Sequence, residues 1–232
     1  MTKPIIVIVE IESVNKNELL SYLENEAKIR IDYLVEGAIE LVEEVHAGVK
    51  REDGTSSFLE THTWPVTLEV IKHYKKENKL LTSLQISGAM LHDIMEDNEK
   101  ILDLYVSKTY GFEAYFMYRF GDYIYKMIMD LKIKPIKNYS GANEEERNSE
   151  RFREYCKILE NAAYDIKTIK LADRINNMQF VAEVPGNEKI QRYLKEAEDF
   201  YIAYTLFTPR MNDFHSKIRS AYDNLRKIKV SV

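Results

Sequence analysis

The chain has 232 residues, of which 45% are hydrophobic, and it carries a formal net charge of −5. This length can form one large domain with its own core, and the acidic balance disfavours nucleic acid as the main partner. There is one cysteine, and no apolar run approaches the ~18 residues that a membrane span needs. We therefore expect a cytoplasmic protein that has no intrachain disulfide and does not cross a membrane.

The N-terminal region predicts a short extended segment and two helices. Residues 5–11 are rich in β-branched side chains, which indicates a strand or an N-terminal arm. Asn15 or Asn17 can cap a helix that continues to about Glu26. Apolar residues at helical spacing then predict a longer helix over residues 28–46.

Capping residues mark two helices in the middle of the chain. Thr63 is a candidate N-cap for a helix over residues 64–76, which has a proline in its first turn. Thr82 and Gln85 form a capping box at the start of the next helix. This helix is expected to continue through residues 86–97.

The remainder of the chain is expected to be helical as well. The predicted segments cover residues 99–110, a Tyr- and Phe-rich region to residue 131, and residues 143–161, 165–181, 187–206 and 213–228. The chain contains only 8 glycines and 5 prolines, which disfavours a β fold with many turns. No repeat or linker divides the sequence, so residues 1–232 are predicted to form a single all-α domain.

The segment over residues 86–97 combines apolar residues with clustered acids. It contains His92 and Asp93, and three residues later the pair Glu96 and Asp97. On a helix, this spacing places one imidazole and three carboxylates around one end of the segment. Burying so many acids is unfavourable unless a cation or a hydrogen-bond network compensates them, so the segment predicts a metal site.

The helix expected over residues 165–181 carries a polar stripe. Lys170, Asp173 and Asn177 fall within about 40° of Ile166 around the helix axis. Apolar residues lie on both sides of this stripe, as in a buried helix. The stripe is therefore expected to face an interior site.

Residues from three parts of the chain resemble a known pattern. His62, the pair His92–Asp93 and the distant Asp173 resemble the H…HD…D signature of HD-domain phosphohydrolases. The neighbouring runs, His-Asp-Ile-Met-Glu-Asp and Lys-Leu-Ala-Asp-Arg-Ile-Asn-Asn-Met, resemble those of Rel/Spo-type hydrolases, which remove the 3′-pyrophosphate of (p)ppGpp. The resemblance covers about residues 44–204 and implies a helical bundle that acts as a stand-alone small alarmone hydrolase.

The four residues of the signature are the candidate metal ligands. Two imidazoles and two carboxylates suit a divalent ion such as Mn²⁺, Fe²⁺, Zn²⁺ or Mg²⁺, and the resemblance favours Mn²⁺. Four protein ligands leave positions on an octahedral ion for water and for a phosphate oxygen of the substrate. The ligands are His62, His92, Asp93 and Asp173.

The resemblance also implies roles for polar residues near the metal. Glu96 and Asp97 are implied to orient and deprotonate the attacking water. Lys170, Arg174 and Asn177 are the candidates for contacts with phosphate and ribose. Arg174 lies at the edge of the polar stripe, and a structural salt bridge is an equal alternative for it.

The segment before His62 departs from the family pattern. Residues 46–54 resemble the opening motif His-x-Gly-Gln-x-Arg-Lys-x-x-Gly, whose arginine is implied to contact guanine, and that role falls on Arg51. Val49 replaces the glutamine of the motif, and Glu52 replaces its second basic residue. The loop from this motif to His62 is also longer than in the family.

These departures keep three alternatives open. A related hydrolase would act on another phosphorylated nucleotide, such as NADPH or an adenosine alarmone. The second alternative is a phosphodiesterase of the wider HD class, and the third is a nucleotide-binding module without turnover. The presence of all four ligands and both acids argues against the third. His46 and His73 are expected in the core or at helix ends rather than at the metal.

Overall fold

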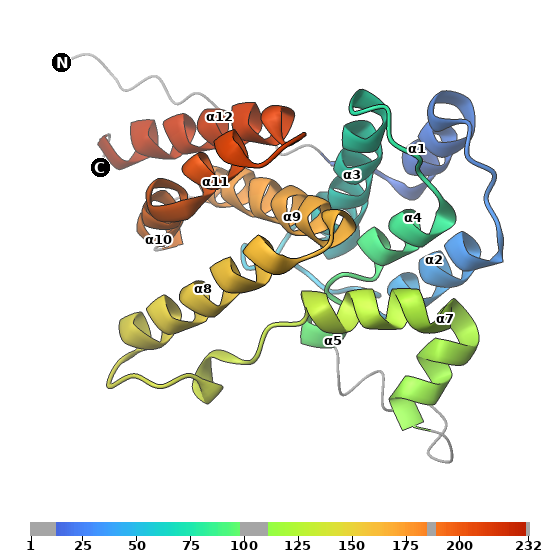
Figure 1. Cartoon of the computed structure of the whole chain (residues 1–232), viewed down its shortest axis with the longest axis horizontal. Helices are drawn as coiled ribbons and strands as arrows, with labels where there is room; N and C mark the ends of the chain where they lie inside the picture. The colour runs from blue at the N-terminus through green and yellow to red at the C-terminus, as the bar shows by residue number, and fades with distance from the viewer. Residues whose placement is uncertain (1–12, 98–110, 185–188, 231–232) are drawn as a thin grey trace.

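Helices form almost all of the regular structure in the computed structural model, which describes residues 13–97, 111–184 and 189–230. The helices are α1 (Lys16–Ser21), α2 (Tyr33–Val45), α3 (Trp64–Lys76), α4 (Ser83–Met90), α5 (Ile94–Asp97), α7 (Gly111–Leu131), α8 (Glu144–Asn161), α9 (Tyr164–Glu183), α10 (Lys189–Glu196), α11 (Ile202–Phe207) and α12 (Asn212–Val230) (Figure 1). Within the described residues, the only β pairing is an isolated antiparallel bridge between Lys50 and Ser57. The all-α prediction is confirmed.

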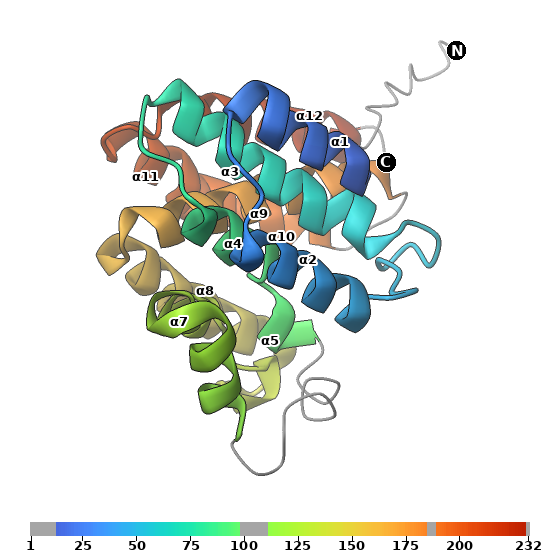
Figure 2. The same cartoon turned by 90° about the vertical axis from the view of Figure 1, so that its right-hand side faces the viewer.

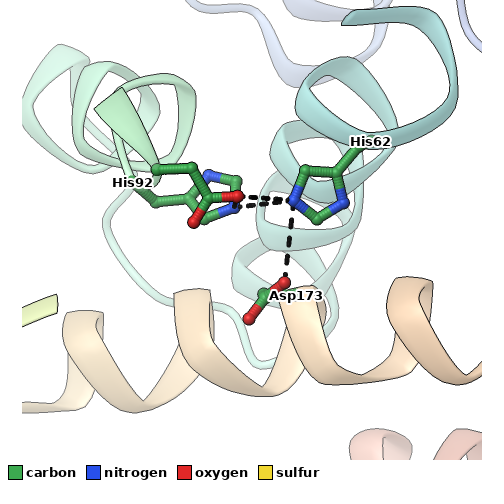
Figure 3. Close-up of side chains that lie close together, drawn as sticks. His62, His92 and Asp173 are labelled. Carbon is green, nitrogen blue, oxygen red and sulfur yellow. Dashed lines mark hydrogen bonds and ion pairs between the residues drawn. The ribbon is translucent and has the colours of Figure 1, made fainter. Parts of the chain in front are cut away.

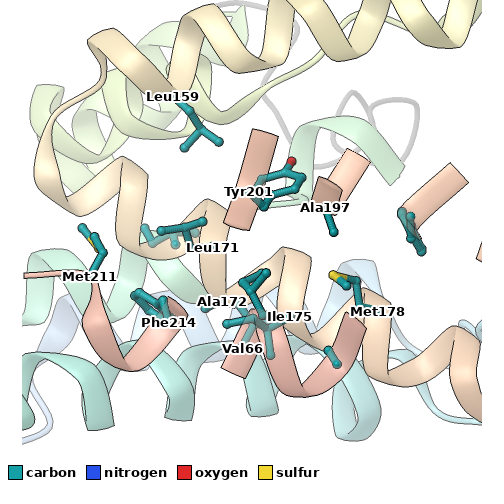
Figure 4. Close-up of a cluster of buried hydrophobic side chains, with 14 of the residues drawn as sticks. Val66, Leu159, Leu171, Ala172, Ile175, Met178, Ala197, Tyr201, Met211 and Phe214 are labelled. Carbon is teal, nitrogen blue, oxygen red and sulfur yellow. The ribbon is translucent and has the colours of Figure 1, made fainter. Parts of the chain in front are cut away.

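The helix α9 lies in the middle of the molecule. It packs against α12 and α3, which lie on different sides of it (Figure 1). Its apolar residues form the centre of one hydrophobic cluster, which includes Leu171, Ile175 and Met178 (Figure 4). Several polar residues of α9, among them Lys170, Asp173 and Asn176, are buried with these apolar residues.

A second hydrophobic cluster joins α1, α2, α3, α4 and α7. In this cluster α2 packs beside α4, and α1 covers part of α3 (Figure 2). The approach of α7 to α4 depends on Gly88, because a Cβ atom there would lie 2.1 Å from Sδ of Met127. Both α3 and α4 contribute residues to the two clusters, so the clusters belong to one continuous helical body.

The expected continuous helix over residues 86–97 is interrupted. The helix α4 ends at Met90, and His92 and Asp93 lie in a turn before α5. The Nδ1 atom of His92 lies 2.7 Å from the carbonyl oxygen of Ala89, an acceptor that a continuing helix would pair with the backbone N–H of Asp93. The side chain of His92 thus replaces a helical hydrogen bond, and the turn aims both His92 and Asp93 inward.

Two other helix starts differ from the sequence prediction. The helix α2 begins at Tyr33 rather than at residue 28, because Asp32 caps the backbone N–H groups of Leu34 and Val35. Thr63 is not an N-cap: it has helical dihedral angles and makes no capping hydrogen bond. Instead, a π-helical turn, Leu59–Thr63, runs directly into α3. His62 belongs to this π-helical turn.

Several local predictions are confirmed. Asn15, one of the two predicted candidates, caps α1, and the predicted capping box at Thr82 starts α4. The possible strand over residues 5–11, the helix over 99–110 and the first two residues of the helix predicted over 187–206 lie outside the described residues. None of the described helices is both long and apolar enough to pass through a bilayer.

Candidate metal centre

Four predicted ligands converge from three separate parts of the chain. His62 comes from the π-helical turn before α3, His92 and Asp93 come from the turn between α4 and α5, and Asp173 comes from the middle of α9 (Figure 3). One ligand atom of each residue lies within 4.8 Å of the ligand atoms of the other three.

The closest contacts of the cluster involve the two imidazole Nε2 atoms. Nε2 of His62 lies 2.7 Å from Oδ2 of Asp93, 3.7 Å from Oδ1 of Asp173 and 3.2 Å from Nε2 of His92. Nε2 of His92 lies 3.1 Å from the same Asp93 oxygen. Four groups that can each donate an electron pair to a metal are therefore directed at one small volume.

Burial makes this arrangement depend on positive charge. The rings of His62 and His92 are only 2% and 1% exposed. Burial alone would lower the pKa of His92, but Asp93, Asp173 and the carbonyl of Ala89 together outweigh it and raise that pKa to about 9. Burial would raise the pKa of Asp93, but His92 and His62 hold it well below its usual range. A metal ion would compete with protons for the same electron pairs.

The ring orientation of His92 fits metal binding. Its Nδ1–H donates to the carbonyl oxygen of Ala89 at 2.7 Å, so its Nε2 atom is the one directed into the cluster. Such an outer hydrogen bond is the usual way in which a protein fixes the tautomer of a metal-binding histidine. The donor set, two nitrogens and two carboxylates, suits a borderline to hard divalent cation.

A cavity of about 650 Å³ opens next to this cluster. His62, Asp93 and Asp173 form part of its wall. Its basic lining residues come from five parts of the chain and outnumber the acidic ones; they are Lys50, Arg51, Lys132, Lys134, Arg151, Lys170, Arg174 and Lys189. A cavity with this lining suits an anionic ligand of small-molecule size, even though the whole chain is acidic.

Glu96 lies in the cavity wall beside the cluster. Its Oε1 atom accepts the backbone N–H of Ile133 at 2.7 Å and lies 3.9 Å from Nζ of Lys170. The side chain is 29% exposed, so a ligand in the cavity can reach it. Burial, opposed by Lys170 and supported by Asp93, raises the pKa of Glu96. The backbone of Asp97 ends α5, and its side chain lies outside the described part of the structure.

The polar stripe of α9 faces the cavity as predicted, but its members have different surroundings. Lys170 is almost fully buried and lies near Glu96. Asn177 donates from Nδ2 to Oδ1 of Asp173 at 2.5 Å. Arg174 forms an ion pair with Glu196, with Nη1 and Oε2 2.7 Å apart. Of the two alternatives for Arg174, the structure contains the salt bridge.

Arg51 is also part of this region, and three of its five N–H donors are used within the protein. Nη1 donates to the carbonyl oxygen of Thr61 at 3.1 Å and to Oδ1 of Asn176 at 2.8 Å. Nη2 donates to Oδ1 of Asn177 at 2.7 Å, and the guanidinium lies 3.7 Å from the ring centroid of Phe180. The guanidinium is thus held by hydrogen bonds and by ring packing at the edge of the cluster.

Sequence reasoning missed Asn176, whose Oδ1 lies 2.7 Å from Nδ1 of His62. The residue stands next to the predicted Asn177, but nothing in the sequence indicates which histidine it contacts. The sequence also gave no role to Lys132 and Lys134, which line the cavity from the segment between α7 and α8, or to Arg151, which lines it from α8. Their signal was weak because basic residues are common in polar connectors.

Comparison with known proteins identifies a family. The family model described as HD domain matches residues 38–203, which is well over half of the chain. This range contains all four residues of the cluster. No curated protein matches the chain significantly.

Proposed function

The chain belongs to the HD-domain family, and we propose on this basis that it is a metal-dependent phosphohydrolase that acts on a small phosphorylated nucleotide. The observation that carries this proposal is the position of the cluster of two histidines and two aspartates in the wall of a largely basic cavity. The cluster offers metal ligands, and the basic lining offers compensation for phosphate charge.

His62, His92, Asp93 and Asp173 would hold the cation, for which Mn²⁺ is the first candidate. A bound divalent ion supplies Lewis acidity, which acidifies water and offsets the negative charge of a phosphate. Glu96 is suited to accept the proton of the attacking water, because the backbone N–H of Ile133 fixes its carboxylate next to the cluster. We assign the same role to Asp97 from the resemblance alone.

Lys170 and Asn177 are the proposed substrate contacts from α9. Lys170 places a buried positive charge in the cavity wall, where it offsets charge on a phosphate oxygen. Arg174 lines the same wall, but its pairing with Glu196 leaves it less free to bind phosphate. The geometry thus favours Lys170 over Arg174 for this role.

The first candidate substrate is (p)ppGpp, by resemblance to Rel/Spo-type hydrolases. The oxygen of water would bond to the phosphorus attached to the 3′-oxygen of the ribose, and the bond between that phosphorus and the 3′-oxygen would break. Pyrophosphate and GDP or GTP are the products. The proton lost by the water passes to Glu96, and the departing 3′-oxygen takes up a proton to become the ribose hydroxyl of the product.

A second candidate is a related nucleotide with another base, such as an adenosine alarmone or NADPH. The contacts of Arg51 favour it, because three of its five N–H groups already bond Thr61, Asn176 and Asn177. Fewer donors are left to read guanine, whereas a guanidinium can stack on any purine. Strong discrimination would need buried hydrogen bonds to the exocyclic groups. We therefore expect looser base selection than in the family.

The test is a nucleotide panel with Mn²⁺-loaded protein, read by release of phosphate and of pyrophosphate. We expect release from at least one nucleotide and none from the Asp93→Ala variant. Absence of release from every nucleotide, by a protein shown to contain metal, would contradict the proposed activity. A preference in kcat/KM for ppGpp of more than about a thousandfold, or roughly 4 kcal/mol, would contradict the looser base selection.

A further inference from the structure

The outer hydrogen bonds of the two histidines differ in kind. The Nδ1 partner of His92 is a backbone carbonyl, whereas the Nδ1 partner of His62 is the side chain of Asn176. A side chain can be changed without moving the backbone, so the support of His62 can be analysed and tested. Asn176 lies on α9 and is 8% exposed.

The orientation of the Asn176 amide follows from its other contacts. Its Nδ2 donates to the carbonyl oxygen of Thr61 at 3.0 Å, which leaves Oδ1 facing His62. Nη1 of Arg51 donates to the same Oδ1 at 2.8 Å, and a guanidinium has no acceptor. The reversed amide would place an NH₂ group against the donors of Arg51, so the surroundings allow one orientation only.

This orientation decides which nitrogen of His62 carries hydrogen. Oδ1 of Asn176 is an acceptor 2.7 Å from Nδ1 of His62, so Nδ1 must be protonated to make a hydrogen bond. Arg51 could offer a hydrogen to a bare Nδ1, but its Nη1 is more distant, at 3.3 Å. The shorter contact prevails, and Nε2 of His62 is left to bind a metal beside Asp93 and Asp173.

Arg51 donates hydrogen bonds to two asparagines, each of which contacts one of the predicted metal ligands. Through Oδ1 of Asn176 it supports His62, and through Oδ1 of Asn177 it supports Asp173, to which Asn177 donates. The guanidinium is itself fixed by packing on Phe180. We propose that Asn176 and Arg51 are positioning residues that hold His62 as its Nδ1–H tautomer and thereby set the metal affinity of the site.

This inference rests on the proposed metal site, and the experiment separates the two. Mn²⁺ affinity is measured from the electron paramagnetic resonance signal of the free ion, without substrate. Asn176→Leu should weaken Mn²⁺ binding by about 10- to 100-fold, since it removes the acceptor. Asn176→Asp keeps an oxygen facing Nδ1 and should restore affinity to within a few-fold of wild type. Gln179→Leu, on the exposed face of the same helix, is the matched control and should have no effect.

The outcomes are distinct. Affinity within about twofold of wild type for Asn176→Leu, or equal losses for the Leu and Asp variants, would overturn the role of Asn176. Unchanged affinity in Asp93→Ala would instead overturn the metal site itself. If Asn176→Leu does not fold, ¹⁵N nuclear magnetic resonance of the Zn²⁺-loaded wild type decides: we expect His62 to be protonated at Nδ1, and protonation at Nε2 would refute the proposal.

The role of Arg51 is tested by whether its substitution raises or lowers the affinity for Mn²⁺. Removing a positive charge near a cation should tighten metal binding if Arg51 acts only by its charge. If Arg51 positions the ligands, Arg51→Met should weaken Mn²⁺ binding, by several-fold or more. Tighter binding in Arg51→Met would overturn its positioning role.

Discussion

Two clusters in this protein bury a histidine against an aspartate at the same distance. Nε2 of His62 lies 2.7 Å from Asp93, and Nδ1 of His73 lies 2.7 Å from Asp213. Both ring nitrogens of His73 have a hydrogen-bond partner within the protein, because Nε2 also lies 2.7 Å from the hydroxyl of Tyr164. Its ring stacks on a phenylalanine and is fully buried.

In the cluster around His62, by contrast, the groups do not form donor–acceptor pairs with one another throughout. Two imidazole nitrogens and two carboxylates are directed at one volume, and none of these groups brings its own positive charge other than by binding a proton. For example, the Nε2 atoms of His62 and His92 lie 3.2 Å apart, although both can offer an electron pair. A buried His–Asp pair is therefore a weak sign of function, whereas a surplus of electron-pair donors at one point indicates a cation site.

Replacing the histidine by phenylalanine should abolish metal binding and activity at the His62 cluster, but should lower only stability at the His73 cluster. His62→Phe removes a ligand and should lower kcat/KM by at least about a thousandfold, or roughly 4 kcal/mol. The purified variant should lose its metal as measured by elemental analysis, while circular dichroism shows a folded helical protein. Metal content equal to that of wild type would remove His62 from the ligand set.

Glu96→Gln should separate chemistry from metal binding. The amide keeps the size of the side chain but cannot accept the proton of water, so we expect kcat to fall by about 10²-fold or more. Mn²⁺ affinity should stay close to that of wild type, because Glu96 is outside the ligand cluster. Near-normal kcat in this variant would return Glu96 to the role of a solvated helix residue.

His73→Phe should affect stability alone. It keeps the stacking on Phe214 but leaves Asp213 buried without its imidazole, which should cost about 2 kcal/mol in the free energy of unfolding. Urea denaturation measures this loss, and metal content should equal that of wild type. Loss of metal in a folded His73→Phe protein would break the distinction between the two clusters.

The features that the sequence predicted are those with local causes. The capping boxes at Asn15 and Thr82 use residues three positions apart, and the stripe on α9 follows from helical periodicity. The convergence of His62 and Asp173 could be expected from the signature pattern, although the positions lie far apart in the chain. These predictions did not require knowledge of how helices pack.

The features that the sequence did not predict include local alternatives to a regular helix as well as tertiary contacts. The end of α4 at Met90 involves the side chain of His92, which takes over the carbonyl of Ala89. The contact of Asn176 with His62 joins residues 114 positions apart, and periodicity cannot specify which ring atom a side chain meets. Asp32 caps α2 through a local contact that the apolar pattern does not reveal, and Thr63 is not a cap because a π-helical turn already precedes α3.

His46 is a third kind of buried histidine and extends the comparison. It is 2% exposed, and within the described residues neither ring nitrogen has a hydrogen-bond partner. Its ring lies 4.7 Å from that of Phe58, which in turn lies 4.9 Å from that of His62. Burial is the main reason that the pKa of His46 falls from 6.5 to about 4.

The expected effect of His46 is a loss of stability in mild acid. Above pH 6.5 the ring is neutral in both the folded and unfolded states and has no influence on the pH dependence. Between pH 6.5 and pH 4 the unfolded chain binds a proton that the folded protein does not bind. The free energy of unfolding therefore decreases as the pH is lowered through this range. At pH 5.5 the loss should be about 1.4 kcal/mol relative to pH 7.5. Urea denaturation of metal-free wild type and His46→Phe at both pH values isolates this contribution, because all other titrating groups are common to the two proteins. An equal response to pH in both proteins would mean that His46 has a partner for its proton and belongs with His73 instead.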